Sequence, residues 1–196
     1  MQIHDEALAN EVDDDLLTYV RTKLQDTDID EGSLHMLAKR AEHLFQWASV
    51  ACFYIAKPPR GLNSKSCLQR VLHPTVSKKA VHPLDALYMT VLERFDMDDN
   101  DIADNFRSVM GQILGAYEPL PIVGLNMLHQ SGTVEDVDFQ STAVSDIVKE
   151  MGSLLSNVSP PSALPVALLH TSFRDFLTDE NRSGNSTSTW TKLTDS

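Results

Sequence analysis

The chain has 196 residues and a formal net charge of -12, and 42% of its residues are hydrophobic. That hydrophobic content is typical of a chain that buries a core, so the sequence as a whole is not that of a disordered protein. The acidic charge makes nucleic acid and anionic membranes poor partners, because both are bound through Lys and Arg.

Two cysteines, Cys52 and Cys67, are too few for a disulfide scaffold and form no CxxC pair. Both lie in apolar helical patterns, so we expect buried free thiols and a reducing, cytoplasmic compartment. The first residues lack the basic start and apolar run of a signal peptide. The longest apolar stretch, residues 44–56, is shorter than the roughly 20 residues that cross a bilayer.

Three helices are predicted in the first part of the chain. The first begins near Asp14 and ends at residues 26–28. The second takes Ser33 as its N-cap, and apolar residues at i, i+3 and i+4 spacing continue over six turns to Ile55. Two prolines end it, and a third, short helix covers residues 67–72.

A break with two prolines, His73 to Pro83, precedes a second group of elements. Four helices are predicted there: one from Pro83, one over 101–115, a short one with Leu125 and Leu128 that ends near Gly132, and one over 139–155.

The pattern changes after residue 155. Residues 159–162 look like a hairpin tip, and the run of Val and Leu at 164–169 predicts a strand. Thr171 can cap a last short helix that contains Phe173. The Ser, Thr and Asn composition beyond residue 181 predicts disorder.

These elements predict a mainly α fold in which a small helical domain is followed by a winged-helix domain with one short β-hairpin. The predicted parts are a flexible N-terminus (1–10), a helical domain (11–75), a linker (76–82), a winged-helix-like domain (83–180) and a disordered tail (181–196). Seven side chains are expected to be buried: Phe45, Trp47, Leu87, Leu114, Ile147, Leu169 and Phe173.

No motif for catalysis is visible. The sequence has no GxxxxGK[ST] loop, no GxSxG elbow, no HExxH helix and no Cys/His cluster with zinc spacing. A small hydrolytic enzyme is disfavoured because no nucleophile and base are evident together. His35 and His43 could share a face of the second helix, but a third metal ligand is lacking, so we expect no catalytic residue and no metal site.

A winged helix raises DNA binding as the alternative function. The candidate recognition helix and its approach are strongly acidic, with Glu135, Asp136, Asp138, Asp146 and Glu150 against Lys149. A helix that docks on phosphates needs the opposite charge, so no nucleic-acid partner is expected.

Three segments carry a family resemblance. They are AEHLFQWASVACFYI at 41–55, PLDALYMTVL at 83–92 and LLHTSFRDFL at 168–177. They resemble, in order and spacing, the "GLFIWA…C.FI", "LDxLYxxIL" and "lHxSFxDFL" motifs that follow the nucleotide-binding core of fungal NACHT-type STAND NTPases, which are NLR-like proteins. The resemblance covers about residues 12–184, and it departs from the family at His43, where the family has Gly.

The resemblance implies a nucleotide switch. In that family the NACHT core binds ADP at rest, the helical and winged-helix domains fold back over the nucleotide, and exchange for ATP opens them and drives oligomerisation. In related NLR proteins the histidine of the last motif contacts the ADP phosphates, and that position is His170 here. The alternative for His170 is a hydrogen bond within the hairpin.

The P-loop core is absent from this sequence, so the chain is expected to hold no cofactor of its own, and His170 would bind ADP only where a NACHT core is supplied. The implied role is a regulatory lid that packs on such a core, in cis or in trans, as an interaction module. The surface that packs on the core is then expected to be an exposed apolar patch.

Overall fold

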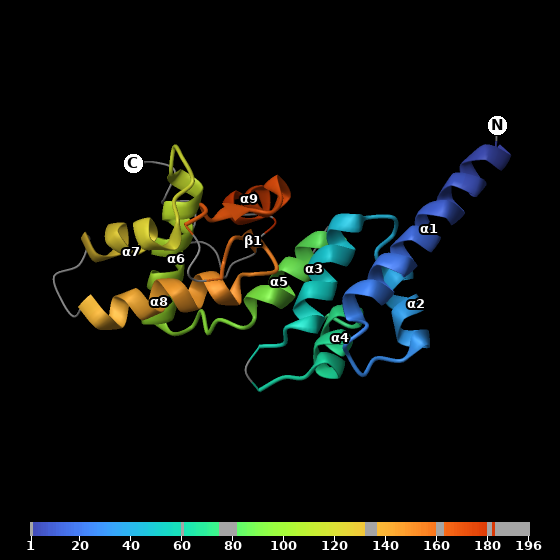
Figure 1. The fold of residues 1–196 in the computed structure, drawn as a ribbon, viewed down its shortest axis with the longest axis horizontal. Helices are drawn as coiled ribbons and strands as arrows, with labels where there is room; N and C mark the ends of the chain where they lie inside the picture. The colour runs from blue at the N-terminus through green and yellow to red at the C-terminus, as the bar shows by residue number, and fades with distance from the viewer. Residues whose placement is uncertain are drawn as a thin grey trace. The chain divides into compact units, whose positions relative to one another are not determined.

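The computed structural model describes residues 2–59, 61–74, 82–131, 137–159, 163–179 and 182. Within these residues the fold is mainly helical with a small two-stranded antiparallel sheet, which confirms the predicted mainly α class (Figure 1). The chain divides into two compact units, Met1–Val91 and Leu92–Ser196. None of the described helices is both long and apolar enough to span a membrane.

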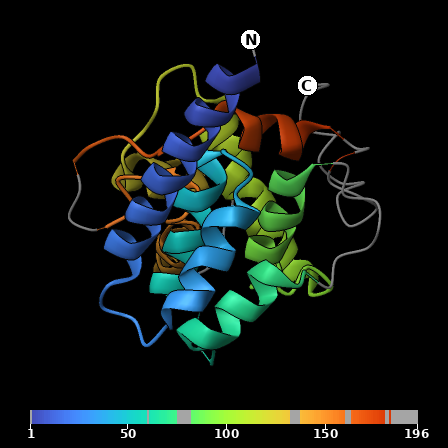
Figure 2. The ribbon, with the colours of Figure 1, turned by 90° about the vertical axis from the view of Figure 1, so that its right-hand side faces the viewer.

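The first unit is built from helices alone in its described residues: α1 (Gln2–Leu24), α2 (Glu31–Arg40), α3 (Phe45–Ala56), α4 (Ser64–Leu72) and α5 (Pro83–Leu92), whose last residue opens the second unit. Helices α1 and α2 run side by side, and α3 packs against α1 and α4 (Figure 2). The core is apolar and includes Leu16, Val20, Leu37, Ile55, Cys67 and Val71. The predicted free, buried state of both cysteines is confirmed.

The second unit contains α6 (Asn100–Gly115), α7 (Ile122–Ser131), α8 (Val137–Glu150), β1 (Leu155–Ser156), β2 (Ala167–Leu168) and α9 (Thr171–Thr178). Helix α7 packs against α8 and α6. The two strands pair antiparallel, with Leu155 opposite Leu168. The core includes Phe106, Val109, Met110, Leu125, Val148, Met151 and Phe176.

The predicted six-turn helix from Ser33 to Ile55 is wrong. The chain leaves the helix after Arg40 and starts a new one at Phe45, with Glu42 at φ 48° and His43 at φ 66°. Two consecutive residues in the left-handed region cannot continue a right-handed helix. Apolar spacing survives the break because α2 and α3 both bury a face in the same unit, so periodicity alone could not reveal the turn.

The N-cap of α2 is Asp30, and the prediction of Ser33 is wrong. The Ser33 backbone N–H donates to Asp30 Oδ1 at 3.0 Å, and the Ser33 hydroxyl donates to Oδ2 at 2.7 Å. These two hydrogen bonds lower the pKa of the Asp30 carboxyl, the side-chain bond most. The carboxylate therefore satisfies an amide that the first turn of the helix leaves without an intrahelical partner.

Two other predicted boundaries are wrong in the second unit. The helix predicted over 139–155 ends at Glu150, and the strand predicted over 164–169 is limited to Ala167–Leu168. Before β2 the chain bonds elsewhere: the Val166 N–H donates to the Leu120 carbonyl at 2.8 Å, and Asn157 Nδ2 donates to the Pro165 carbonyl at 2.8 Å. Proline has no N–H for a ladder, which limits the strand on this side.

Most of the predicted core residues are buried: Trp47, Leu87, Ile147 and Phe173. Leu114 is half-buried. Phe45 and Leu169 were predicted wrongly, since they are 44% and 45% exposed. Phe45 is the first residue of α3 and meets only the edge of Tyr19 among the described rings, at 5.9 Å between centroids. Leu169 lies between β2 and α9, outside the paired strands.

Several predicted features lie outside the described residues. They are the linker at 76–82 except His82, the helix end at Gly132, most of the hairpin tip at 159–162, and the tail at 181–196 except Arg182. The predicted start of the first helix near Asp14 is wrong, because α1 begins at Gln2. The domain boundaries drawn from the sequence stay predictions. In the structure the chain passes from the first compact unit to the second after Val91.

Arg94 holds the carbonyl end of α8. Its side chain is 7% exposed, and Nη1 donates to the Glu150 carbonyl oxygen and, at 3.2 Å, to the Glu150 carboxylate. A cation at a helix C-terminus complements the negative end of the helix dipole. This contact lies where α8 ends, and residues 151–154 then turn into β1.

We expect His43→Gly to raise the free energy of unfolding by about 1 kcal/mol, because glycine adopts φ 66° without steric cost whereas an L-residue does not. His35→Gly, within α2, should instead lower it by about 1 kcal/mol. Urea denaturation measures both, and Asp13→Asn reports separately what the 3.1 Å His43–Asp13 contact contributes. If both glycine variants lowered the free energy of unfolding, the proposed backbone strain at His43 would be wrong.

Arg94→Ala should lower the free energy of unfolding by about 2 kcal/mol, because it strips a nearly buried cation from the end of α8. Arg107→Ala is the matched control, since the 2.6 Å Arg107–Asp104 pair is largely exposed on the Asp104 side and should change stability by less than about 1 kcal/mol. Equal effects in chemical denaturation would refute the role of Arg94.

Candidate functional site

His170 lies at the junction between the hairpin and α9. It is the N-cap of that helix, with extended backbone angles (φ -147°, ψ 139°), and its side chain makes no capping hydrogen bond. The residue is exposed. Thr171, predicted to be the cap, is instead the first helical residue. The imidazole of His170 therefore stands at the positive end of a helix dipole and is open to a ligand.

The hairpin fixes the position of His170 from its N-terminal side. The Leu169 N–H donates to the Leu154 carbonyl at 3.0 Å, one residue before His170. The Ser156 hydroxyl adds a bond to the Ala167 carbonyl at 3.2 Å. These bonds tie the chain to β1 immediately before the histidine.

Helix α9 fixes His170 from its C-terminal side. Phe173, Phe176 and Leu177 are each 1% exposed, and the two phenyl rings stack with centroids 6.2 Å apart. Arg174 is exposed and lies one helical turn after His170. The apolar residues of the last motif thus anchor the helix, while its histidine and arginine remain exposed to solvent.

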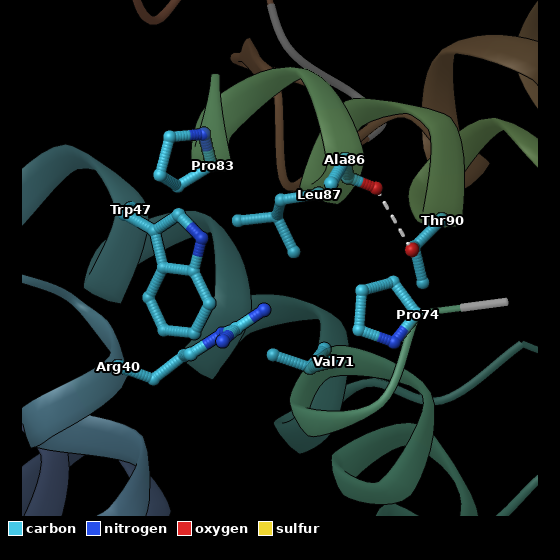
Figure 3. Close-up of a pocket in the computed structure, with 8 residues that line it drawn as sticks. All are labelled: Arg40, Trp47, Val71, Pro74, Pro83, Ala86, Leu87 and Thr90. Atoms are coloured by element: carbon cyan, nitrogen blue, oxygen red, sulfur yellow. Dashed lines mark hydrogen bonds between the residues drawn. The ribbon is translucent and has the colours of Figure 1, made fainter. Parts of the chain in front are cut away.

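The first two motifs pack together in the first unit. Gln46 Nε2 of the first motif donates to the Tyr88 hydroxyl of the second at 2.7 Å. Figure 3 shows Trp47 of α3 facing Leu87 of α5 across a small hollow, with the guanidinium of Arg40 beside the indole. Segments about 40 residues apart in sequence therefore form one structural unit.

This hollow is not a nucleotide site. Its volume is about 10 Å³, which is about the room that one water molecule needs. Thr90, one of the residues that line it, donates its hydroxyl to the Ala86 carbonyl at 2.9 Å rather than to the space. The space is a packing gap between α3, α4 and α5.

The two histidines considered as a metal pair are separated by the helix break. His35 Nδ1 lies 2.9 Å from the Glu31 carbonyl oxygen in α2, whereas His43 Nε2 lies 3.1 Å from the Asp13 carboxylate of α1. In the described part of the chain no three His, Cys, Asp or Glu side chains are grouped to hold a metal ion.

Burial raises the pKa of the Cys52 thiol to about 12, which makes it unreactive at neutral pH.

A buried polar pair, Ser108 and His129, was not predicted from the sequence. The Ser108 hydroxyl of α6 lies 3.1 Å from Nδ1 of His129 in α7. The two residues are 21 positions apart and share no motif, so the sequence carries no signal for them. His129 is 6% exposed, and burial lowers the pKa of its imidazole. A buried, neutral imidazole in a helix interface points to a packing role.

The second unit should lose stability as the pH falls below 6.5. The folded state lowers the pKa of His129 below its ordinary value of 6.5, so between these two values the unfolded chain binds a proton that the folded chain does not. The contribution is complete above pH 6.5 and is lost on acidification. Urea titrations at several pH values should show a smaller drop in His129→Gln than in the parent, and His35→Gln serves as the control. An unchanged drop in His129→Gln would contradict this.

Comparisons of the chain with protein-family models, with curated proteins and with solved structures find no match.

Proposed function

We propose that this chain is a non-catalytic regulatory region of an NLR-like nucleotide switch, a lid that packs on a nucleotide-binding core. The observation that carries the proposal is the arrangement of the last motif. Its apolar residues, including Phe173 and Phe176, are buried, and His170 is exposed at a helix N-terminus. That division is what a motif needs if one residue reaches a ligand and the others hold it in place.

The helix break supports the resemblance independently. The family has Gly where this chain has His43, and His43 adopts φ 66°, a conformation that glycine favours. A turn between α2 and α3 accounts for a glycine at that position in relatives. The match between the motif and the backbone does not depend on side-chain similarity.

The contact between the first two motifs is a second support. Gln46 and Tyr88 come from separate motifs and share a 2.7 Å hydrogen bond. Motifs that pack on one another are expected to occur together and in fixed order. For the second unit, we propose a winged-helix-like arrangement of α6, α7, α8, the hairpin and α9, on the basis of that element order.

In the proposed lid, His170 meets the phosphates of ADP held by a core. An imidazole donates a hydrogen bond to a phosphate oxygen, and the amides at the start of α9 favour the same negative charge. Arg174, exposed one turn later, would add a cation on that side. The chain itself then contributes a contact to the nucleotide and no catalytic step.

DNA binding by the second unit is disfavoured by its charge. Residues 92–196 hold 16 Asp and Glu against six Lys and Arg, a net charge of -10. Of the predicted recognition helix, Asp146 and Lys149 are exposed and Glu150 is tied to Arg94, while Glu135 and Asp136 lie outside the described residues. A surface of this sign repels phosphates.

The deciding experiment adds the chain to a NACHT core from a fungal NLR-like protein loaded with fluorescent ADP. We expect the chain to bind the core and slow ADP release, and His170→Ala to lose about tenfold of that effect, the size expected for a hydrogen bond to a charged group. His35→Ala, which replaces another exposed histidine, should behave as the parent does.

Unchanged ADP release with the parent chain would contradict the proposal. Retention of the chain on duplex DNA at low salt, with release at high salt, would favour the DNA-binding alternative instead.

A further inference from the structure

Helix α7 has one buried and one exposed apolar face. Ile122, Leu125 and His129 are buried where the helix packs on α6 and α8. On the rest of the helix Val123 is 59% exposed, Met127 is 66% exposed and Leu128 is 48% exposed. Val123 and Met127 are four residues apart and so lie on the same face.

This helix carries no charge. Residues 119–132 contain no Asp, Glu, Lys or Arg, although the second unit as a whole has a net charge of -10. A surface helix normally presents charged residues to water. Single exposed apolar side chains are common, but three on one uncharged helix indicate a surface that meets another molecule.

Apolar exposure continues beside the helix. The segment before α7 holds Tyr117, which is fully exposed, and the bond from the Val166 N–H to the Leu120 carbonyl brings residues 164–166 alongside that segment. Leu164 is 61% exposed there. We name these five residues, Tyr117, Val123, Met127, Leu128 and Leu164, the α7 surface.

The α7 surface belongs to a unit with a net charge of -10. Glu118 follows Tyr117 directly, and the helices packed on α7 expose Asp101 and Asp146 against Lys149, while Asp104 is paired with Arg107 at 2.6 Å. An uncharged apolar surface on so acidic a unit favours a partner that combines apolar contacts with Lys or Arg at the edge of its contact face.

We propose that the α7 surface is a docking site for a protein whose contact face is apolar at its centre and basic at its rim. The inference rests on the interaction role proposed above, and it adds the face used and the chemistry of the partner.

A second copy of the chain fits this surface poorly. The exposed area of the five side chains is roughly 600 Å², short of the roughly 800 Å² per partner in a stable interface. Contacts at the rim must therefore supply the remainder. Two copies would bring together two units that each have a net charge of -10, which is destabilising, whereas a basic partner is attracted to the same unit.

The test uses two synthetic amphipathic helical peptides with the same leucine face, one with lysine and one with glutamate at all other positions. Fluorescence anisotropy measures the binding of each to the full chain. We expect the lysine peptide to bind, more weakly as salt rises, and the glutamate peptide to bind at least tenfold more weakly. Equal binding of the two peptides would overturn the proposed basic rim.

Variants locate the site. Val123→Thr with Met127→Gln should weaken binding of the lysine peptide about tenfold, since two apolar anchors are lost. Met36→Gln, at an exposed methionine of α2, is the matched control and should leave binding unchanged. Circular dichroism checks that the helices are intact, and equal affinity of the double variant and the parent would refute the α7 site.

Two further readouts separate the alternatives. Sedimentation of the parent should show a monomer at all concentrations, whereas a dimer abolished by the double variant would assign the surface to a second copy. If the NACHT core binds the double variant as well as the parent, the docking site is wrong and the lid function stands. If the lysine peptide binds at α7 and the core does not bind at all, the lid function is wrong and the docking site stands.

Discussion

The left-handed turn at Glu42 and His43 is the constraint on which the first unit depends. It ends α2 and lets α3 start in a new direction, so that α3 packs against both α1 and α4. The same change of direction places Gln46 and Trp47 against α5. A straight helix through these residues would carry them along the α2 axis. The backbone cost at two non-glycine positions is therefore offset by the packing of three helices.

The second unit separates its two kinds of surface. Its core holds α6, α7 and α8 together through apolar contacts, and Arg94 secures the end of α8. The unit as a whole has a net charge of -10, yet α7 presents uncharged apolar side chains to solvent. Solubility and folding require no such gap in the charge. An uncharged apolar helix on an acidic unit is consistent with binding to a partner. The regulatory lid proposed from the motif at His170 also requires a partner.

Local patterns in the sequence were enough to predict the helical class, the start of α5 at Pro83, the short α4 and the burial of Trp47 and Phe173. They failed where a tertiary contact or an unusual backbone angle decides the outcome. The break at Glu42 preserved apolar spacing, the last residue of α8 is bound by Arg94 from 56 residues away, and Leu169 lies outside the paired strands. His170 was found by motif, and its exposure at the α9 N-terminus needed the structure.

His170 and the α7 surface place different demands on the unit that carries both. A histidine that contacts a phosphate needs a fixed position, which the hairpin and the buried rings of α9 provide. A docking helix needs only an exposed face and a stable inner one, which Leu125 and His129 provide. Because the anchors of the two features are different residues, loss of one feature need not remove the other. The proposed nucleotide contact and the proposed docking of a partner can therefore be altered separately in this unit.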